Sequence, residues 1–491
     1  MAQKRLKTTS ETPLAMDRIS KLPDSVIQHI LSFLPTVDVV RTSLLSKFWR
    51  RMWYSVPTLC FSNSSTEFGS LRDQEGFYKY VDNCLKHRKI GSSDSVITRL
   101  KLDMRQCTRS NAYPSDMLPL EEYESIVEER RRSNSHRLDK WLAFAVESKV
   151  KELNLYLDSK PPLLFLLFRS IFYYCLPETV VNARYLTVME LEGIKLSTSL
   201  TFRLPSLKIL SLKDVRLSDV GLDKLLLGCP SLEKFMLSDD CVLTKGRFHS
   251  SSLKFLEIER SAFLSIQVEA INLESFILCD VRSFEKIHLS ACKAIKNLSL
   301  CGVVADQSLE DLISKLPLLE NLTLIHWDSS EHIKISSQHL KSFHLKNISE
   351  DEVKVTIGLA PNLASFCYEG GINLSISMDQ SPNLLNGNFV IDESPVHYDG
   401  DWYNDLMNFL SNLNCSWNIV SLQVSSDEAL ILPEKLRRVC RSPSLSWKHL
   451  KVMTTCEPKS ELDLREALLW FSPSLETLSI NQNSYKVEDL F

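Results

Sequence analysis

A leucine-centred unit that recurs at near-constant spacing constrains this chain more than any other feature. The stretch "LKILSLKDVRL" (207–217) shows the pattern, L-x-x-L-x-L-x-x-(apolar)-x-L. Successive side chains of an extended strand point to opposite faces, so Leu210 and Leu212 should point inward, and Ile209 and Ser211 outward. One unit cannot bury its own leucines, whereas stacked units can. Copies of the unit start at residues 186, 207, 232, 253, 273, 295, 319, 340, 363 and 384.

The intervals between these starts, 20 to 25 residues, fall within the period of leucine-rich repeats. The sequence therefore predicts an α/β fold, a curved leucine-rich-repeat solenoid with one parallel strand per repeat on its inner side. Looser copies predict irregular repeats towards both ends. They begin at residues 97, 150, 419, 447 and 475.

Helices are expected in the two longest intervals of the regular run, because the shorter return paths barely suffice for a parallel crossover. The first, "SDVGLDKLLLGC" (218–229), places leucines on one face and should end at Gly228 as a C′ glycine. The second, "SLEDLISKLP" (308–317), begins with a capping-box-like pair, Ser308 and Asp311, and should stop at Pro317.

The head of the chain has a different character. The segment "LPDSVIQHILSFLPTVDVVRTSLLSKFWRRMW" (22–53) has apolar residues at helical spacing, interrupted by Pro35. Thr36 is placed to cap a second helix, and in a third helix Trp49 should stack on Trp53 one turn later. Three short helices cannot cover this much apolar surface among themselves, so another molecule should cover part of it.

This segment resembles the F-box of plant F-box/leucine-rich-repeat proteins. "DRIS" (17–20), "LPD" (22–24), "ILSFLP" (30–35) and "SKFW" (46–49) all fall in register, although Phe48 stands where the family usually has Arg. The carboxyl end is similar to the closing segment of related proteins, without enough of the FBD pattern to claim that domain. The resulting division is 1–16 flexible N-terminus, 17–57 F-box, 58–149 linker and irregular first repeats, 150–400 leucine-rich repeats, and 401–491 irregular repeats with an FBD-like cap.

The resemblance implies a function. F-box proteins dock on a Skp1-like adaptor and thereby join a cullin–RING ubiquitin ligase (the SCF complex), while their repeats bind the substrate protein. By position, the adaptor-binding residues would be Leu22, Pro23, Ile27, Ile30, Leu31, Leu34, Pro35, Val39, Trp49 and Trp53. By strand alternation, the substrate-binding candidates include Met236, Glu257, Ile277, Ser299, Thr323, His344 and Cys367. Two alternatives remain: a small-molecule (hormone-type) co-receptor of the same architecture, and an interaction scaffold outside any ligase.

Net charge and targeting signals limit the classes of partner and the compartments to be expected. The net charge of −4 over 491 residues gives no general attraction to nucleic acid or anionic membranes. The first twenty residues lack the apolar core of a secretory signal, so we expect a reducing compartment, the cytoplasm and/or nucleus. The apolar run "LLFLLFRSIFYYCL" (163–176) is shorter than a membrane span and contains Arg169, so we expect a buried segment.

Catalytic and metal-binding motifs are missing from the sequence. It contains no G-x-x-x-x-G-K-[ST], G-x-S-x-G or H-E-x-x-H, and its thirteen cysteines form no C-x-x-C pair. Four histidines between 326 and 344 belong to different repeats without a consistent ligand spacing. We therefore expect a non-catalytic protein without a cofactor or metal, and neither a disulfide framework nor a zinc site.

Overall fold

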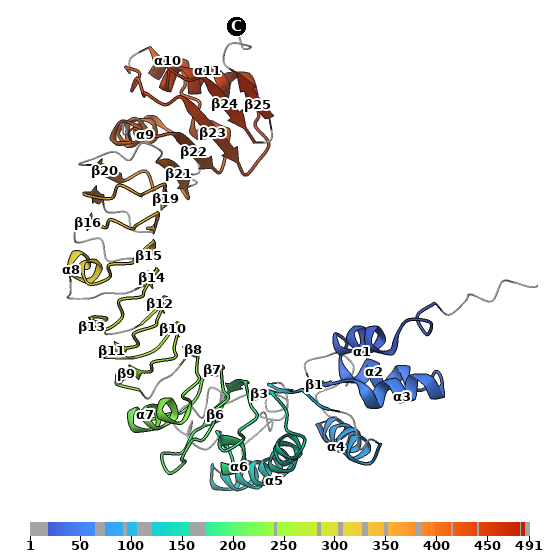
Figure 1. Ribbon diagram of the computed structural model, residues 1–491. Coiled ribbons are helices and arrows are strands. Elements are labelled where there is room, and N and C mark those ends of the chain that lie inside the picture. Colours follow the sequence, from blue (N-terminus) through green and yellow to red (C-terminus); the bar gives the residue numbers. More distant parts are fainter. Residues whose placement is uncertain are drawn as a thin grey trace, which may run out of the picture. The chain divides into compact units, whose positions relative to one another are not determined.

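The computed structural model divides into two compact units, an N-terminal unit (1–194) and a C-terminal unit (195–491), which are described separately (Figure 1). The structure describes residues 18–63, 74–91, 96–105, 120–157, 173–239, 243–281, 286–302, 308–326, 332–347, 352–378, 385–393, 395, 397–413, 416–438, 441–481 and 483–486. Most of the apolar run at 163–176 lies outside these ranges. None of the described helices combines the length and the apolar character that crossing a lipid bilayer requires.

Three short helices open the N-terminal unit: α1 (Asp24–Ser32), α2 (Thr36–Thr42) and α3 (Lys47–Ser55). The predicted capping role of Thr36 is wrong, because Pro35 is the N-cap and Thr36 is the first helical residue. The Thr36 hydroxyl is buried and accepts the backbone N–H of Cys60 at 2.7 Å. Thr36 thus ties α2 to β1 (Thr58–Ser62), the first strand of the repeats.

A buried arginine anchors the end of α3. Arg88 lies on α4 (Gln74–Gly91) and donates hydrogen bonds to the carbonyls of Trp53 at 2.5 Å and Val56 at 2.7 Å. Its guanidinium carbon also lies 5.2 Å from the centroid of the Trp53 ring. Carbonyls at a helix end have no partner within the helix, and the helix dipole favours a cation there. Arg88 supplies both the donors and the charge, although burial lowers its pKa to about 10.

The repeats begin immediately after α3. The strands β1, β2 (Arg99–Met104), β3 (Glu152–Leu157) and β5 (Val188–Glu192) pair in parallel. Their second residues lie in register and are buried: Leu59, Leu100, Leu153 and Met189. The remaining elements of this unit are α5 (Leu120–Glu147), β4 (Tyr174–Cys175), α6 (Glu178–Val181) and the start of β6 (Ile194–Lys195).

The C-terminal unit continues with one parallel strand per repeat, each in register with the next, as the period predicts. The alternation is confirmed in the first of these strands, where Leu210 and Leu212 are buried while Ile209 and Ser211 are partly exposed. A final hairpin strand pairs antiparallel. The main strands are β7 (Ile209–Lys213), β8 (Lys234–Ser238), β10 (Phe255–Glu259), β12 (Ser275–Cys279), β14 (Asn297–Cys301), β15 (Asn321–Ile325), β17 (Ser342–Lys346), β19 (Ser365–Gly370), β21 (Asn386–Ile391), β22 (Ile419–Val424), β23 (His449–Thr454), β24 (Thr477–Ile480) and β25 (Asn483–Lys486).

Six consecutive repeats end their strand with a residue in the left-handed region. The N–H of each donates to the last carbonyl of the next main strand, at 2.8 to 3.2 Å, so the ladder extends one residue beyond the strand. Only Gly adopts this conformation without a steric cost, and one of the six is Gly302. The residues and their φ angles are Asp214 (49°), Asp239 (58°), Arg260 (45°), Asp280 (52°), Gly302 (58°) and His326 (50°).

The helices predicted on the return paths are present, as α7 (Asp219–Gly228) and α8 (Leu309–Ser314). Two predictions about the ends of these helices are wrong. Ser308 is the N-cap of α8, but its side chain makes no capping hydrogen bond. Gly228 is the last residue of α7 and does not adopt a positive φ; a Cβ there would lie only 2.4 Å from the carbonyl oxygen of Phe202. Close packing therefore requires this glycine.

Short strands on the opposite side of the C-terminal unit form two small parallel sheets, which the sequence pattern did not predict (Figure 1). They are β9 (Lys245–His249), β11 (Ser265–Glu269) and β13 (Lys286–His288), and β16 (Ile333–Ile335), β18 (Val353–Ile357) and β20 (Leu374–Met378). Longer intervals near the carboxyl end hold helices instead. These are α9 (Gly400–Asn412), η4 (Asp427–Ala429), α10 (Glu434–Arg437) and α11 (Glu461–Phe471).

Candidate functional site

Large apolar side chains remain exposed on the helices α1–α3 and their connections. Phe33 is 75% exposed and Leu44 is 79% exposed, although both lie in a unit with a well-formed core. Exposed apolar side chains concentrated in so short a segment indicate an interaction surface. We call this set the docking surface; its members are Ile19, Leu22, Val26, Ile30, Phe33, Leu34, Leu44 and Leu45.

The ten predicted adaptor-binding residues divide into two groups. Leu22, Pro23, Ile30, Leu34 and Pro35 are exposed, and Trp49 is partly exposed. The other four point into the helical core and cannot contact a partner directly in this conformation: Ile27, Leu31, Val39 and Trp53. Helical periodicity marks a residue as apolar but does not show whether the face it belongs to is covered. These four are therefore reassigned as support for the docking surface.

Sequence reasoning did not assign Phe33, Leu44 or Leu45 to the partner. Each lies at or beyond the end of a short helix, where the 3.6-residue periodicity no longer says which way a side chain points. The available signal was that these residues are apolar and stand close to Pro35 or to Ser46, the N-cap of α3. Phe48, the departure from the usual arginine, packs edge-on against Trp49 and lies under the Arg51 guanidinium, 5.4 Å from the ring centroid.

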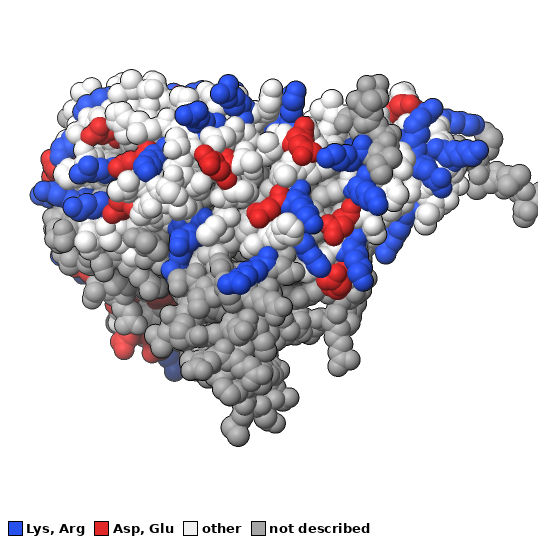
Figure 2. All heavy atoms as spheres, turned by 90° about the horizontal axis from the view of Figure 1, so that it is seen from below, with Lys and Arg blue, Asp and Glu red and all other residues white. Residues whose placement is uncertain are grey.

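The helical region is basic although the whole chain is not. Between residues 18 and 57 six Lys and Arg stand against two Asp, a local charge of +4, compared with −4 for the whole chain. All six cationic side chains are exposed. On the face drawn in Figure 2, Lys and Arg side chains gather over these helices. Such a distribution favours an acidic partner. The six are Arg18, Lys21, Arg41, Lys47, Arg50 and Arg51.

The seven predicted substrate-binding residues lie side by side. Each is the third residue of its strand, and the pairing register joins them into one continuous row: Met236, Glu257, Ile277, Ser299, Thr323, His344 and Cys367. All seven are partly exposed. We call this set the third-position row. It lies on the inner face, which consists of the first, third and fifth residues of the main strands.

The row has titratable side chains at its second and sixth positions, Glu257 and His344, and none between them. Burial, followed by the neighbouring Glu259 carboxylate, raises the pKa of Glu257. Burial lowers the pKa of His344, whose Nε2 lies 4.0 Å from a Glu369 carboxylate oxygen and has no hydrogen-bond partner among the described residues. Between Glu257 and His344, the inner face of β12, β14 and β15 shows only uncharged side chains. They are Ser275, Ile277, Cys279, Asn297, Ser299, Cys301, Asn321, Thr323 and Ile325.

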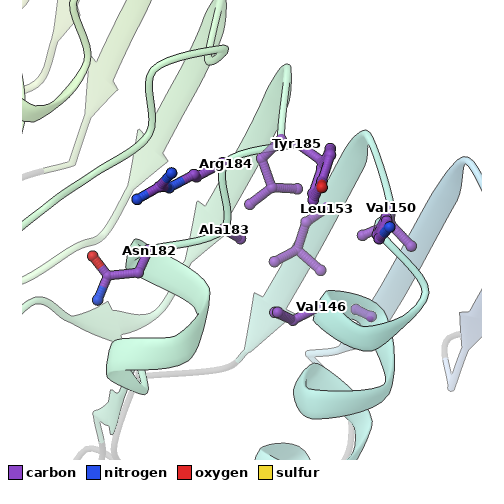
Figure 3. A pocket seen from close by; sticks show the side chains of 10 residues that line it. Val146, Val150, Leu153, Asn182, Ala183, Arg184 and Tyr185 are labelled. Atoms are coloured by element: carbon purple, nitrogen blue, oxygen red, sulfur yellow. The ribbon is translucent and has the colours of Figure 1, made fainter.

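Two of the cavities in the described parts of the chain bear on ligand binding. One lies in the C-terminal unit beside β11 and β13, holds about 430 Å³ and is lined by Gln267, Glu269 and His288 among others. The one in Figure 3 lies in the N-terminal unit and holds about 200 Å³, below the roughly 300–1,000 Å³ of typical ligand pockets. Val146, Val150 and Leu153 give it an apolar wall. At its mouth, the Lys149 ammonium lies 5.3 Å from the Tyr185 ring centroid. Asn182, Arg184 and Tyr185 add polar groups, but the volume of this cavity is small for a hormone-sized ligand.

Comparison with known proteins finds two family models that match this chain. The model of the F-box domain matches residues 19–61. A second model, described as the leucine-rich repeats of FBD-associated F-box protein At5g56370, matches residues 138–296. The two matches fall on α1–α3 and on successive parallel strands, as the fold requires.

Curated relatives come from Arabidopsis thaliana. F-box/FBD/LRR-repeat protein At2g26030 is 26% identical over 333 residues, covering 67% of this chain and 62% of that protein. Putative F-box/LRR-repeat protein At5g02930 is 31% identical, covering 54% of this chain and 48% of that protein. FBD-associated F-box protein At5g56380 is 33% identical, covering 47% and 46%. The matched region thus spans about half of the length of these relatives. With an F-box at its amino terminus and leucine-rich repeats behind it, this chain is a plant F-box/leucine-rich-repeat protein.

Proposed function

We propose that this protein is the substrate-recognition subunit of an SCF ubiquitin ligase. The docking surface on α1–α3 binds a Skp1-like adaptor and through it a cullin–RING ligase, and the repeats bind the protein to be ubiquitinated. The observation that carries the proposal is the exposure of eight large apolar side chains on an F-box whose core is otherwise buried. Burying a central aliphatic anchor at such an interface commonly contributes about 2 kcal/mol or more.

The local charge supports the same assignment. Six exposed cations lie in the same segment as the docking surface, so an adaptor with an acidic face would be attracted over distances of about one Debye length, roughly 8–10 Å at physiological salt. Such attraction raises the association rate more than the affinity. The apolar side chains then hold the complex, and salt should slow its formation without abolishing it.

Substrate capture takes place on the inner face of the repeats. The uncharged block on β12, β14 and β15 suits a neutral segment of a protein client, and Glu257 and His344 at its two sides limit which flanking charges are accepted. The protein provides binding only, and the ubiquitin ligase provides the chemistry. We place this activity in the cytoplasm and/or nucleus.

Adaptor docking is tested by co-precipitation from a mixture of purified proteins. Replacing Leu22 and Pro23, both exposed, by Ala should abolish capture of a Skp1-like adaptor by the full chain. The matched control is the double substitution of Pro317 and Leu318 by Ala, an exposed apolar pair in the C-terminal unit, which should leave capture unchanged. Undiminished capture by the first variant would contradict the assignment.

The client-binding part has its own test. A triple change at Met236, Glu257 and His344 to Ala should remove client proteins found by crosslinking in cells with the proteasome blocked, while adaptor capture persists. If every client interaction survives the triple change, the third-position row does not bind the clients. Reconstituted ubiquitination of a captured client then separates a ligase receptor from a scaffold.

A further inference from the structure

Two thiols and one carboxylate from adjacent repeats converge on the inner face. Cys279 ends β12 and Cys301 ends β14, and the two residues are paired neighbours in the sheet. The carboxylate of Asp280, the next residue, completes the group: its ligand oxygen and the two Sγ atoms all lie within 4.8 Å of one another. Two sulfur ligands of a tetrahedral zinc ion, with Zn–S bonds of about 2.3 Å, are about 3.8 Å apart. Small side-chain rotations therefore suffice to reach that geometry.

The stacking of the repeats brings these groups together although two of them are far apart in the sequence. Cys279 and Cys301 are separated by 22 residues, one repeat, so the zinc spacings of short motifs do not apply. Asp280 is fixed in the left-handed region, with its N–H bonded to the Cys301 carbonyl at 2.8 Å. A Cβ on Gly302 would lie 2.8 Å from Asp280 Oδ1, so the glycine leaves room for the carboxylate beside Cys301.

The carboxylate of Asp280 is free to act as a ligand. Among the described residues, no side chain or backbone group makes a hydrogen bond or ion pair with it. The charge of Arg260 interacts with Asp280, but its guanidinium donates its hydrogen bonds to Asp239, at 2.7 and 3.1 Å. Asp280 is exposed and the two cysteines are partly exposed, so an ion can reach all three groups from solvent.

We propose that Cys279, Cys301 and Asp280 form a binding site for a thiophilic divalent cation such as Zn²⁺. Two sulfurs and one oxygen supply three of the four positions that this ion prefers, and the fourth position faces solvent on the inner face. The site does not depend on the ubiquitin-ligase role. It departs from the expectation of a chain without a metal site, which rested on the lack of C-x-x-C pairs and of a consistent histidine spacing.

Binding is measured on the full chain in a metal-free buffer with a phosphine reductant. Titration with Co²⁺ should produce thiolate-to-cobalt charge-transfer absorption that saturates at one ion per chain and disappears on adding Zn²⁺. Changing Cys279 and Cys301 to Ser should abolish this absorption. Changing Asp280 to Asn should weaken Co²⁺ binding by at least about tenfold, the lower limit for losing even an outer-shell partner.

The matched control changes Cys60 and Cys367 to Ser, two partly exposed cysteines of other strands, and should keep the full signal. Loss of the signal in the control but not in the Cys279/Cys301 variant would overturn the proposal, as would no signal in the wild type. A second measurement uses no variant. Zn²⁺ should protect Cys279 and Cys301 from maleimide, read by mass spectrometry, and should not protect the exposed Cys175 and Cys456. Equal protection of all four, or of neither of the first two, refutes the site.

Discussion

Phe33 offers the clearest measure of what the docking surface contributes. An aromatic side chain buries roughly 150–250 Å², so the 75% of Phe33 that is exposed leaves about 150 Å² for a partner to cover. At about 25 cal/mol per Å², this amounts to about 4 kcal/mol, of which the remaining Ala keeps a part. We expect Phe33→Ala to weaken adaptor binding by about 2–3 kcal/mol, roughly 30- to 150-fold in Kd.

The stability of the chain should hardly change, because this side chain makes few contacts in the free protein; a shift within about 0.5 kcal/mol is expected. Isothermal titration calorimetry with a purified Skp1-like adaptor measures the Kd, and thermal unfolding measures the stability. Leu227→Ala is the control, since Leu227 is also 75% exposed but lies on α7 in the repeats. A Kd within threefold of wild type for Phe33→Ala, or an equal loss for Leu227→Ala, would refute the assignment of the surface.

Two further predictions concern the stability of the N-terminal and the C-terminal unit. Arg88→Met should destabilise the N-terminal unit by about 3 kcal/mol in chemical denaturation, because two buried carbonyls at the end of α3 lose their donors; Arg437→Met, which loses a similar contact at a partly exposed site, should cost less than about 1 kcal/mol. Gly228→Ala should lower the stability of the repeats by about 2 kcal/mol or more, since its Cβ would meet the Phe202 backbone at 2.4 Å, whereas Gly400→Ala, with nothing within 4 Å, should be neutral or slightly stabilising. Equal melting temperatures for the two glycine variants would show that Gly228 is not a packing requirement.

The repeat stack was predictable because each unit carries its own register signal. The pair Leu210 and Leu212 illustrates this: burial alternates along one strand, the period repeats the pattern, and parallel pairing follows without knowledge of any distant contact. The third-position row follows from the same logic, since alternation fixes which residues share a face. Periodicity is a local property, and the fold here is built almost entirely from neighbouring repeats.

Details that depend on distant contacts were not predictable. Thr36 looks like a cap from its neighbours, but its hydroxyl is used by Cys60 in the next element. Gly228 looks like a C′ glycine, but the backbone of Phe202, 26 residues earlier, determines its role. Nothing in the sequence indicated that Arg88 binds the end of α3, because its partners are main-chain carbonyls, which every sequence contains. The short outer strands lack leucines at fixed spacing and depend on the return path available to each repeat.

The docking surface itself was predicted only in outline, for a related reason. An apolar residue on a short helix can face the interior or a partner, and sequence distinguishes the two only through the total area that the domain can cover. Ile27 and Ile30 share one helix and one character, yet the first is buried and the second is 43% exposed. The metal-binding group escaped notice because its ligands recur at the repeat period rather than within one motif.

A domain that exposes this much apolar area must be held together from elsewhere. About 35 residues in three short helices bury too little surface to be stable alone. Here the missing stability comes from the following elements: Thr36 is bonded to β1, and Arg88 on α4 closes the end of α3. These contacts touch only the buried sides of the helices, so the docking surface stays exposed without threatening the fold. Arg88→Met should therefore weaken adaptor binding through the fold of α3, and a stabilising solute that restores the melting temperature should also restore the affinity, whereas it should not rescue Phe33→Ala.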